Sequence, residues 1–325
     1  MIEISNLTKR YGAVTAIQNI NFSVHKGEIV GFLGPNGAGK TTTMKIITGF
    51  MAPTTGAVKV AGFDVFESPI EVKKRIGYLP ETPPVYTDML VKDYLEYVAQ
   101  LKGLKGEAVS KGVAQALEKA NIGGVQNRLI GNLSKGYRQR VGIAQALVHN
   151  PEVLILDEPT VGLDPKQVIE IRNLVKALAG EHTVVLSTHI LPEVTATCQR
   201  IIIINQGQIV AEDTLEGLSR RMSDTKRYYV RVRRTGEIEN YLRKLRNVTA
   251  VIHGAAPNSF EVELDKSEDS NELLAEAVVK SGAGLIEFRA LDASLEDIFL
   301  KLTTVDHAAA AHKAAKSTAQ MNAEA

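Results

Sequence analysis

The chain lacks the features of secreted, disulfide-bonded and membrane-spanning proteins. Its 325 residues include one cysteine, Cys198, so no disulfide can form within one chain. We expect this cysteine to be a small residue on a helix face. The longest apolar runs, such as Ile201–Ile204, have the length of a strand and are far shorter than the roughly 20 residues that cross a bilayer. No basic segment followed by an apolar core opens the sequence, so we expect no signal peptide.

The sequence also lacks an excess of charge of either sign. Lysine and arginine number 38, and aspartate and glutamate number 37. The overall charge therefore does not indicate nucleic acid or membrane lipid as a partner. The basic segment at 226–234 is more typical of one solvated strand face than of a binding surface. The length suggests about two domains, and we expect a cytosolic protein that only a separate protein would hold at a membrane.

The most informative segment is glycine-rich. Gly34–Thr41 fits the phosphate-binding pattern G-x-x-x-x-G-K-[ST] at every fixed position. The apolar run Glu28–Leu33 predicts a buried strand before it, and Thr42–Ile47 predicts a helix after it. This order points backbone N–H groups and the positive end of a helix at one spot, where a phosphate chain would bind. A glycine-rich turn without a ligand is the alternative, and the flanking elements argue against it.

The side chains of this loop have separate expected roles. Lys40 would reach the β- and γ-phosphates, and the Thr41 hydroxyl would ligate Mg²⁺. The glycines would let the backbone close around phosphate oxygens without a side-chain clash. The residues expected to contact the nucleotide here are Asn36, Gly37, Ala38, Gly39, Lys40, Thr41 and Thr42.

A second apolar strand ends in two acids. It spans Glu152–Leu156 and is followed by Asp157 and Glu158. Asp157 is expected to hold Mg²⁺ through water, and Glu158 is the candidate general base for an attacking water. A buried strand capped by solvated acids is the alternative, which the phosphate loop makes less attractive.

A capped helix is the third pattern. After Leu133–Tyr137, apolar residues recur at helical spacing at Val141, Ala144 and Leu147. Ser134 therefore lies at or just before the helix start, as a natural N-cap. Without further context, the pattern indicates only a well-capped helix whose end is another anion site.

Together these segments resemble the motifs of the ATP-binding subunit of ATP-binding-cassette (ABC) transporters. Gly34–Thr41 corresponds to the family's phosphate loop, and Leu133–Tyr137 corresponds to its signature, usually Leu-Ser-Gly-Gly-Gln. Val153–Glu158 corresponds to the family's acidic strand, and Gly162–Pro165 corresponds to the loop that crosses to the partner subunit. Ser187–His189 corresponds to the segment with the switch histidine, and Lys9–Gly12 to the segment with the aromatic residue that stacks on adenine. The resemblance covers roughly residues 2–220 and is specific because all these motifs follow the family's order.

The resemblance implies an α/β fold, namely a P-loop NTPase of the ABC ATPase type at 1–220 with a helical subdomain at about 82–150. It implies that His189 bonds the γ-phosphate and holds the attacking water together with Glu158. It also implies that Tyr11 stacks on adenine, for which a core tyrosine is the alternative. The implied cofactors are ATP and Mg²⁺.

The resemblance further implies a head-to-tail pair of subunits with two ATP molecules between them. Each nucleotide would be held by Lys40 and Thr41 of one subunit and by Ser134 and Gly136 of the other, and Asp164 lies in the crossing loop. The second subunit is either another copy of this chain or a relative. The remaining implied partner is an integral-membrane permease at the cytoplasmic face of the membrane, and no nucleic acid is expected.

Three residues depart from the family pattern. Glu81 stands where glutamine is usual; its carboxylate can bind Mg²⁺ or orient water but cannot donate a hydrogen bond at neutral pH. Lys135 replaces the first glycine of the signature pair, and its ammonium would reach a phosphate or point to solvent. Tyr137 replaces the last signature residue. Because Lys40 and the acidic residues remain, we expect an active hydrolase.

A second, smaller α+β domain is expected at 224–303, followed by a disordered tail at 306–325. Its expected strands are 228–233, 248–253, 259–264 and 285–290, and its expected helices are 237–245, 271–280 and 295–302. An appendage of this kind, ending in a stretch like Ser294–Phe299, resembles the branch that drives ABC-2-type export, which includes multidrug, sodium and gliding-motility-like ATPases.

The sequence therefore favours the ATP-hydrolysing motor of an ABC-2-type membrane exporter. A soluble ABC ATPase that acts on ribosomes, DNA or cluster assembly is the alternative, but the chain has one phosphate loop and no long heptad repeat. A regulatory protein that holds ATP without hydrolysing it is a third possibility, and Glu158 and His189 argue against it. No residue of the chain indicates the transported substrate.

Overall fold

The computed structural model describes residues 1–222, 226–236, 238–265, 270–291 and 299. It divides into two compact units, Met1–Leu215 and Glu216–Ala325. Apart from residue 299, the expected final helix at 295–302 lies outside the described residues, as does the expected tail at 306–325.

The first unit is built on a six-stranded sheet in the order β10-β9-β3-β8-β7-β6. All neighbouring strands are parallel except β10, which is antiparallel to β9. The strands are β3 (Ile29–Leu33), β6 (Ile76–Leu79), β7 (Val153–Asp157), β8 (Thr183–Thr188), β9 (Arg200–Asn205) and β10 (Gln208–Thr214). Central strands β3, β7 and β8 are buried along their whole length because both faces of the sheet are covered. The continuous apolar runs in the sequence have this cause.

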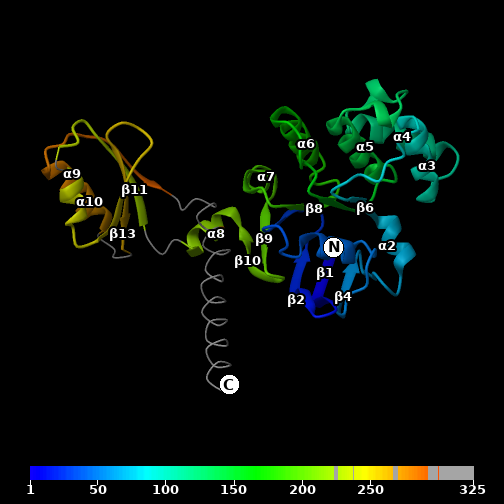
Figure 1. The fold of residues 1–325 in the computed structure, drawn as a ribbon, viewed down its shortest axis with the longest axis horizontal. Coiled ribbons are helices and arrows are strands. Elements are labelled where there is room, and N and C mark those ends of the chain that lie inside the picture. The colour runs from blue at the N-terminus through cyan, green and yellow to red at the C-terminus, as the bar shows by residue number, and fades with distance from the viewer. Residues whose placement is uncertain (223–225, 237, 266–269, 292–298, 300–325) are drawn as a thin grey trace, which may run out of the picture. The chain divides into compact units, whose positions relative to one another are not determined.

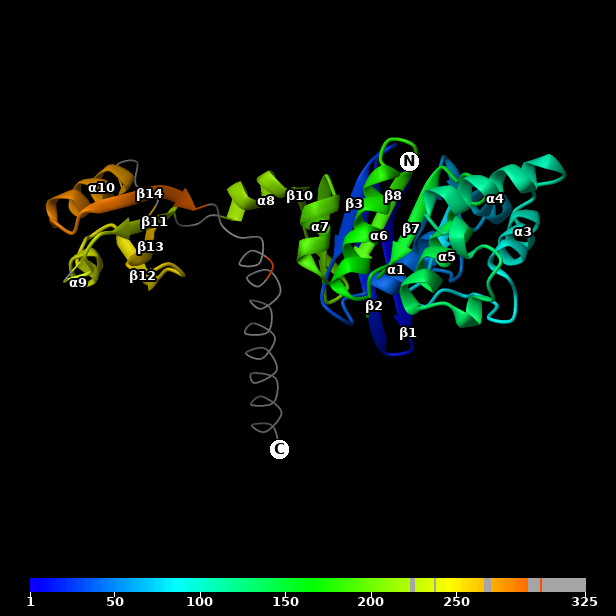
Figure 2. The same cartoon turned by 90° about the horizontal axis from the view of Figure 1, so that it is seen from above.

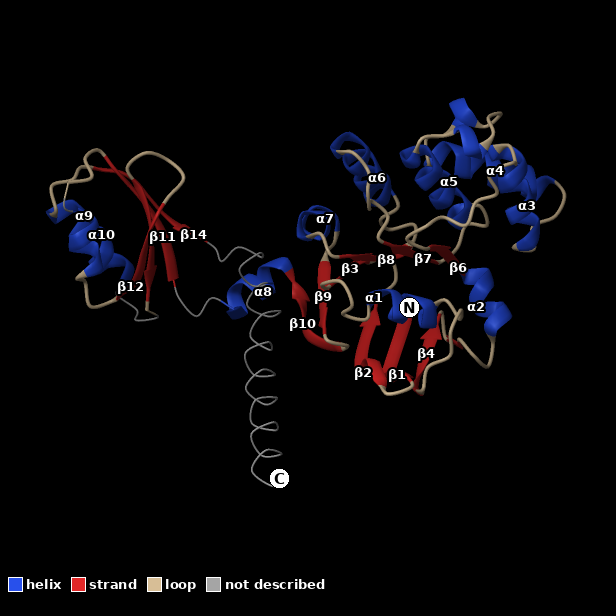
Figure 3. Ribbon diagram, in the orientation of Figure 1, coloured by secondary structure: helices blue, strands red, loops and turns tan. Residues whose placement is uncertain are grey.

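A four-stranded antiparallel sheet with the order β2-β1-β4-β5 forms the other layer. Its strands are β1 (Ile2–Tyr11), β2 (Val14–Val24), β4 (Thr55–Val60) and β5 (Phe63–Asp64). Helix α1 (Lys40–Ile47) lies between the two sheets (Figure 3), and its buried Met44, Ile46 and Ile47 join both in one core. The other face of the six-stranded sheet carries α6 (Pro165–Ala177) and α7 (Leu191–Thr197).

The helices between β6 and β7 form a lobe of their own (Figures 1 and 2). They are α3 (Val91–Leu101), α4 (Glu107–Lys119), two short 3-10 turns (Gly123–Val125 and Ile130–Asn132) and α5 (Lys135–Leu147). A further helix, α2 (Pro69–Arg75), precedes β6. The helix predicted after Ser134 is confirmed as α5, and so is the predicted N-cap, since the Tyr137 N–H donates to the Ser134 hydroxyl.

The second unit is a βαββαβ arrangement with the antiparallel sheet order β12-β13-β11-β14, as in ferredoxin-like folds. Its elements are α8 (Leu215–Met222), β11 (Lys226–Val232), α9 (Ile238–Arg243), β12 (Val248–His253), β13 (Ser259–Leu264), α10 (Ser270–Lys280) and β14 (Leu285–Leu291). Leu242, Leu274 and Val278 of the helices pack against one sheet face. The predicted strands and both described helices of this unit are confirmed within two residues at each end.

Cys198 is a small correction to the sequence prediction. It is the C-cap that follows α7, with extended backbone, and does not lie within the helix. Its buried thiol packs against Gly31 of β3, and burial raises the pKa of the thiol to about 12. The residue is therefore part of the core and has no reactive thiolate at neutral pH.

Candidate nucleotide-binding site

The glycine-rich loop joins β3 to α1, as the sequence predicts. Gly37 and Gly39 have φ angles of 80° and 108°, which favour glycine. A Cβ at Gly39 would also lie 2.6 Å from Ile17 Cγ2, so a larger residue would clash with β2. The glycines thus set the close approach of the loop to β2 and start α1 at Lys40.

A cavity of about 430 Å³ opens above this loop. Its lining brings together the loop with all three predicted catalytic residues, Glu81, Glu158 and His189. The remaining lining residues are Ala16, Asn36, Gly37, Gly39, Lys40, Thr41, Thr42 and Val161. Ala16 and Val161 were missed by sequence reasoning, because an apolar residue in a strand or loop carries no chemical signal. Ala38 is buried and does not line the cavity.

Lys40, Glu158 and His189 form a chain of contacts across the cavity. The Lys40 ammonium lies 3.2 Å from Glu158 Oε1, and the two side chains are only 6% and 8% exposed. The same ammonium donates to the carbonyls of Gly34 and Pro35 at 2.8 and 3.2 Å. Glu158 Oε2 lies 2.9 Å from His189 Nδ1. The carboxylate of Glu158 is therefore fixed between a cation and an imidazole.

The backbone of Glu158 adopts an unusual conformation. Its φ angle is +50°, a left-handed value that costs a non-glycine residue about 1–3 kcal/mol. The residue follows the last residue of β7, and its N–H donates to the Ser187 carbonyl of β8 at 2.8 Å. This bond keeps the turn against the sheet, so the strained backbone sends the Glu158 side chain toward the loop while Asp157 stays in the core.

Asp157 fits a role as a cation ligand. Its Oδ1 accepts a hydrogen bond from Ser187 Oγ at 2.7 Å, whereas its buried Oδ2 has no hydrogen-bond partner. Burial raises the pKa of the carboxyl, and the Ser187 hydroxyl and the neighbouring Thr41 act against this. A fully buried carboxylate with one free oxygen beside a threonine hydroxyl suits a hard cation such as Mg²⁺. No cluster of three or more histidine, cysteine or acidic side chains that could hold a metal occurs among the described residues.

The signature residues lie apart from this cavity. Gly136 and Asp164 line a second cavity of about 560 Å³ together with Tyr137, and Ser134 caps α5. The Gln167 side chain of α6 lies against Gly136, where a Cβ would come within 2.5 Å of it. One chain therefore does not bring Ser134, Gly136 or Asp164 to its own phosphate loop.

Two of the three departures from the family pattern, Glu81 and Lys135, lie close together, whereas Tyr137 lines the second cavity. Glu81 is exposed and lines both the loop cavity and an adjoining groove of about 370 Å³ that Lys135 also lines. The Lys135 side chain is exposed, and its ammonium packs against the backbone of Gly162 in the crossing loop. The lysine thus reaches across from the start of α5 to the loop before α6.

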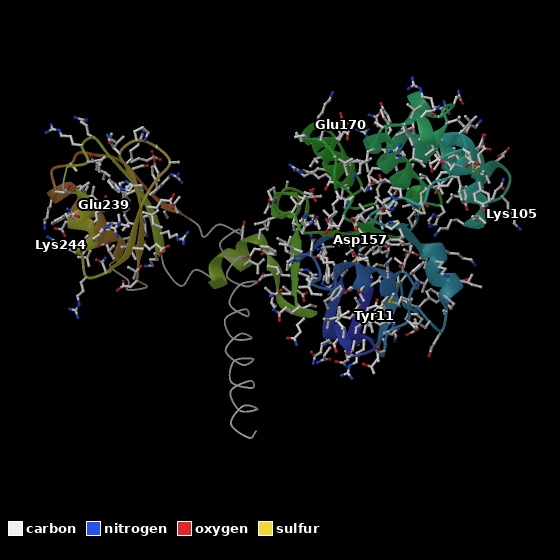
Figure 4. The ribbon with its side chains drawn as sticks, in the orientation of Figure 1. Tyr11, Lys105, Asp157, Glu170, Glu239 and Lys244 are labelled. Atoms are coloured by element: carbon white, nitrogen blue, oxygen red, sulfur yellow. The ribbon has the colours of Figure 1, made fainter. Side chains whose placement is uncertain are left out.

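Tyr11 lies at the end of β1 and does not line the cavity. The residue is 45% exposed, which argues against the alternative of a core tyrosine. The hydroxyl donates to Met51 Sδ at 2.8 Å, and the Lys9 ammonium lies 5.4 Å from the ring centroid. Figure 4 shows Tyr11 on the antiparallel sheet and Asp157 at the six-stranded sheet.

Comparison with known proteins bears on both units. Residues 17–161 match the family model described as ABC transporter, and residues 215–303 match the model of the DrrA1-3-like ATP-binding protein C-terminal domain. None of the helices in the described part of the chain has the length and apolar character needed to cross a membrane.

Relatives with assigned names match over almost the whole chain. The bacitracin transport ATP-binding protein BcrA of Bacillus licheniformis is 32% identical over 93% of this chain and 97% of its own length. The linearmycin resistance ATP-binding protein LnrL of Bacillus subtilis is 33% identical over 93% and 98%. Among solved structures, the dimeric ATP-binding cassette MJ0796 bound to ADP and Pi has a TM-score of 0.60 and 29% identity over 66% of this chain and 99% of that one.

Proposed function

The chain belongs to the ATP-binding proteins of ABC transporters, and from this premise we propose that it is the ATP-hydrolysing motor of an ABC-2-type exporter. The DrrA-like second unit and the relatives named for bacitracin transport and linearmycin resistance support export. They also argue against a soluble ABC ATPase uncoupled from transport. A separate permease would carry the substrate, and this chain would attach to it at the cytoplasmic face of the membrane.

In the proposed mechanism, phosphate binding changes the partner of Lys40. The ammonium that pairs with Glu158 is the loop's only lysine and would turn to the β- and γ-phosphates. Glu158 would then lose its cation and accept a proton from the attacking water. His189, already 2.9 Å from Glu158, would hold that water against the γ-phosphate. Tyr11, at the end of β1, would stack on the adenine.

The magnesium ion would bind at Thr41 and Asp157. The buried, unpartnered Oδ2 of Asp157 supports this assignment. Glu81, on the exposed rim of the same cavity, would orient water or complete the site. When bound, the ion would neutralise charge that develops on the phosphate oxygens during transfer.

Two copies would assemble head to tail around two ATP molecules. In one chain, Ser134 and Gly136 lie away from the phosphate loop, so they would reach a γ-phosphate only on a partner. The solved cassette that resembles this chain is also a dimer. The γ-phosphate would favour the closed dimer, and its loss on hydrolysis would favour opening.

The observation that carries the proposal is the carboxylate of Glu158, held over the phosphate loop between Lys40 and His189. Glu158→Gln keeps the shape of the side chain but removes its ability to accept a proton. We expect the rate of ATP hydrolysis to fall by at least about 100-fold, as is typical for loss of a general base. ATP should still bind, and size-exclusion chromatography in Mg-ATP should show a stable dimer.

A matched control keeps the result specific. Glu181→Gln changes an exposed glutamate that pairs with Lys119 of α4, outside both the loop cavity and the second cavity that Gly136 lines. This variant should hydrolyse ATP at nearly the wild-type rate. An unchanged rate in Glu158→Gln would refute the proposed base, and wild-type protein that binds no ATP would refute the proposed function.

A further inference from the structure

A buried glutamate outside the nucleotide cavity connects the two loops that carry Glu158 and His189. Glu193, on α7, is only 3% exposed. Its Oε1 accepts a hydrogen bond from the Thr160 hydroxyl, and its Oε2 accepts one from the Thr188 hydroxyl at 2.8 Å. Both threonines are buried as well.

The two threonines flank the proposed catalytic pair in the sequence. Thr160 follows Glu158 by two residues, and Thr188 immediately precedes His189. Glu158 and His189 also meet directly, at 2.9 Å. The backbones and side chains therefore close a ring: Glu158 to His189 through their side chains, then Thr188, Glu193 and Thr160, and back to Glu158 along the chain.

Several backbone bonds fix the same ring. The Thr188 hydroxyl accepts from the Ile190 N–H at 3.1 Å, which shapes the turn around His189. The Thr160 carbonyl accepts from the Leu163 N–H at 3.1 Å, which shapes the crossing loop. Glu193 itself is anchored because its N–H donates to the Ile190 carbonyl and the next residue, Val194, packs against Gly31.

Burying the carboxylate of Glu193 costs more free energy than a purely structural side chain would. A buried carboxylate loses its hydration, and within the described part of the chain no lysine, arginine or histidine forms an ion pair with it. Two hydroxyl donors satisfy its hydrogen bonds but do not neutralise it. An apolar side chain of the same length would fill the site at a lower cost in free energy. A glutamate at this position therefore indicates that its two hydrogen bonds are needed.

The strained backbone of Glu158 explains why these bonds are needed. A left-handed non-glycine residue persists only where its surroundings over-determine the conformation. The Ser187 carbonyl holds the N–H of Glu158, and the Thr160–Glu193 bond holds the chain two residues later. Without the Thr160–Glu193 bond, the turn after β7 would relax more easily from its left-handed conformation.

We propose that Glu193 is a positioning residue for ATP hydrolysis, which sets the geometry of Glu158 and His189 through Thr160 and Thr188 without touching the nucleotide. The inference rests on the proposed function, because it assigns the reaction to that pair. It predicts that loss of the Glu193 hydrogen bonds lowers the rate of the chemical step and leaves ATP binding intact.

The test compares Glu193→Met, which removes both acceptors, with Glu193→Gln, which keeps the shape and can still bond both threonines. We expect kcat to fall about ten- to a hundred-fold in the methionine variant, as when a catalytic group is misplaced by up to about 1 Å. The glutamine variant should recover most of this loss. The Kd for ATP should stay unchanged in both, because only an interaction important in the transition state is lost.

A double-mutant cycle separates this pathway from general damage. Thr160→Val removes one donor and keeps the β-branched shape, so it should lower kcat in the wild type and have little further effect in Glu193→Met. Thr195→Val is the matched control, because this threonine lies on the same helix and its hydroxyl donates to the Pro192 carbonyl, away from Thr160 and Thr188. It should hydrolyse ATP normally.

A readout that does not depend on turnover tests the same ring. The imidazole ¹⁵N resonances of His189 report its bond to Glu158, and they should move in Glu193→Met but not in Thr195→Val. Unchanged resonances and an unchanged kcat would overturn the inference, as would a parallel loss of ATP affinity. Failure of the proposed function is distinguishable, because it appears in the wild type and in Glu158→Gln and not in the Glu193 series.

Discussion

Burial sets the protonation state of single residues in this molecule. His149, two residues after the end of α5, is an example. Its Nε2 lies 3.1 Å from the Ile76 carbonyl, which also accepts from the Lys102 ammonium at 3.0 Å. Burial, with the nearby Lys102 and His182 charges, lowers the pKa of His149 to about 4. The folded protein therefore keeps this imidazole neutral.

The lowered pKa predicts a loss of stability in acid. The unfolded chain binds a proton near the usual pKa of 6.5, whereas the folded chain binds it only near 4. Stability is therefore present above pH 6.5 and is lost as the pH falls from about 6.5 to 4. His149→Leu removes this linkage, and the Ile76 carbonyl keeps the bond from Lys102.

We expect the free energy of unfolding of His149→Leu to fall less than that of the wild type between about pH 7.5 and 4.5, by about 2 kcal/mol. Urea unfolding at both pH values measures the difference. The variant's own stability at pH 7.5 is the reference, so any packing change cancels. Parallel pH profiles for the two proteins would contradict the assignment.

At the residue scale, sequence predicts chemistry better than conformation. The loop lysine and the two acids were predicted from residue type and order, and the switch histidine was predicted through the family resemblance. Their proposed roles still await the experiments above. The left-handed backbone of Glu158 was not predictable, because it depends on the bond from its N–H to the Ser187 carbonyl of β8, a strand that is distant in the sequence. The same holds for Glu193, whose partners lie 33 and 5 residues away.

At the element scale, close approach between backbones fixes how the helical lobe joins the sheet. Gly77 of β6 faces α5, where a Cβ would lie 2.1 Å from the Ala146 carbonyl oxygen. Neither atom belongs to a flexible side chain, so a larger residue must push the strand and helix apart. The contact also fixes the start of the segment that leads to Glu81.

Gly77→Ala should therefore destabilise the protein by about 1–3 kcal/mol, as overpacking does in a dense core. Gly124→Ala is the control, because a Cβ at Gly124 meets nothing within 4 Å. Thermal unfolding should show a lower midpoint for the first variant and nearly the wild-type midpoint for the second. Equal midpoints for Gly77→Ala and the wild type would show that β6 and α5 separate without cost.

The elements themselves were largely predictable, and their order in the sheets was not. Apolar runs and helical spacing marked β3, β7, β8 and the four strands of the second unit. The sequence carries no local signal that β1, β2, β4 and β5 leave the six-stranded sheet and form their own antiparallel layer. That arrangement follows from burying α1 on both sides, which is a tertiary effect.

At the scale of the whole molecule, the division of the site between two subunits is the strongest expectation. The phosphate loop, Glu158 and His189 line one cavity, and Gly136 lines another. If each working site takes its loop from one chain and its signature from the other, two different defects should complement each other. Lys40→Ala removes the loop lysine, and Ser134→Arg blocks the signature with a bulky cation.

Neither variant alone should hydrolyse ATP, because every site in each homodimer contains a defect. A mixed dimer has one site with the intact loop of the Ser134→Arg chain and the intact signature of the Lys40→Ala chain. Mixing the two should therefore restore activity well above the sum of the separate proteins, with a maximum at equal amounts. A mixture that never exceeds that sum would mean that each chain hydrolyses ATP with its own residues alone, and the head-to-tail arrangement would have to be abandoned.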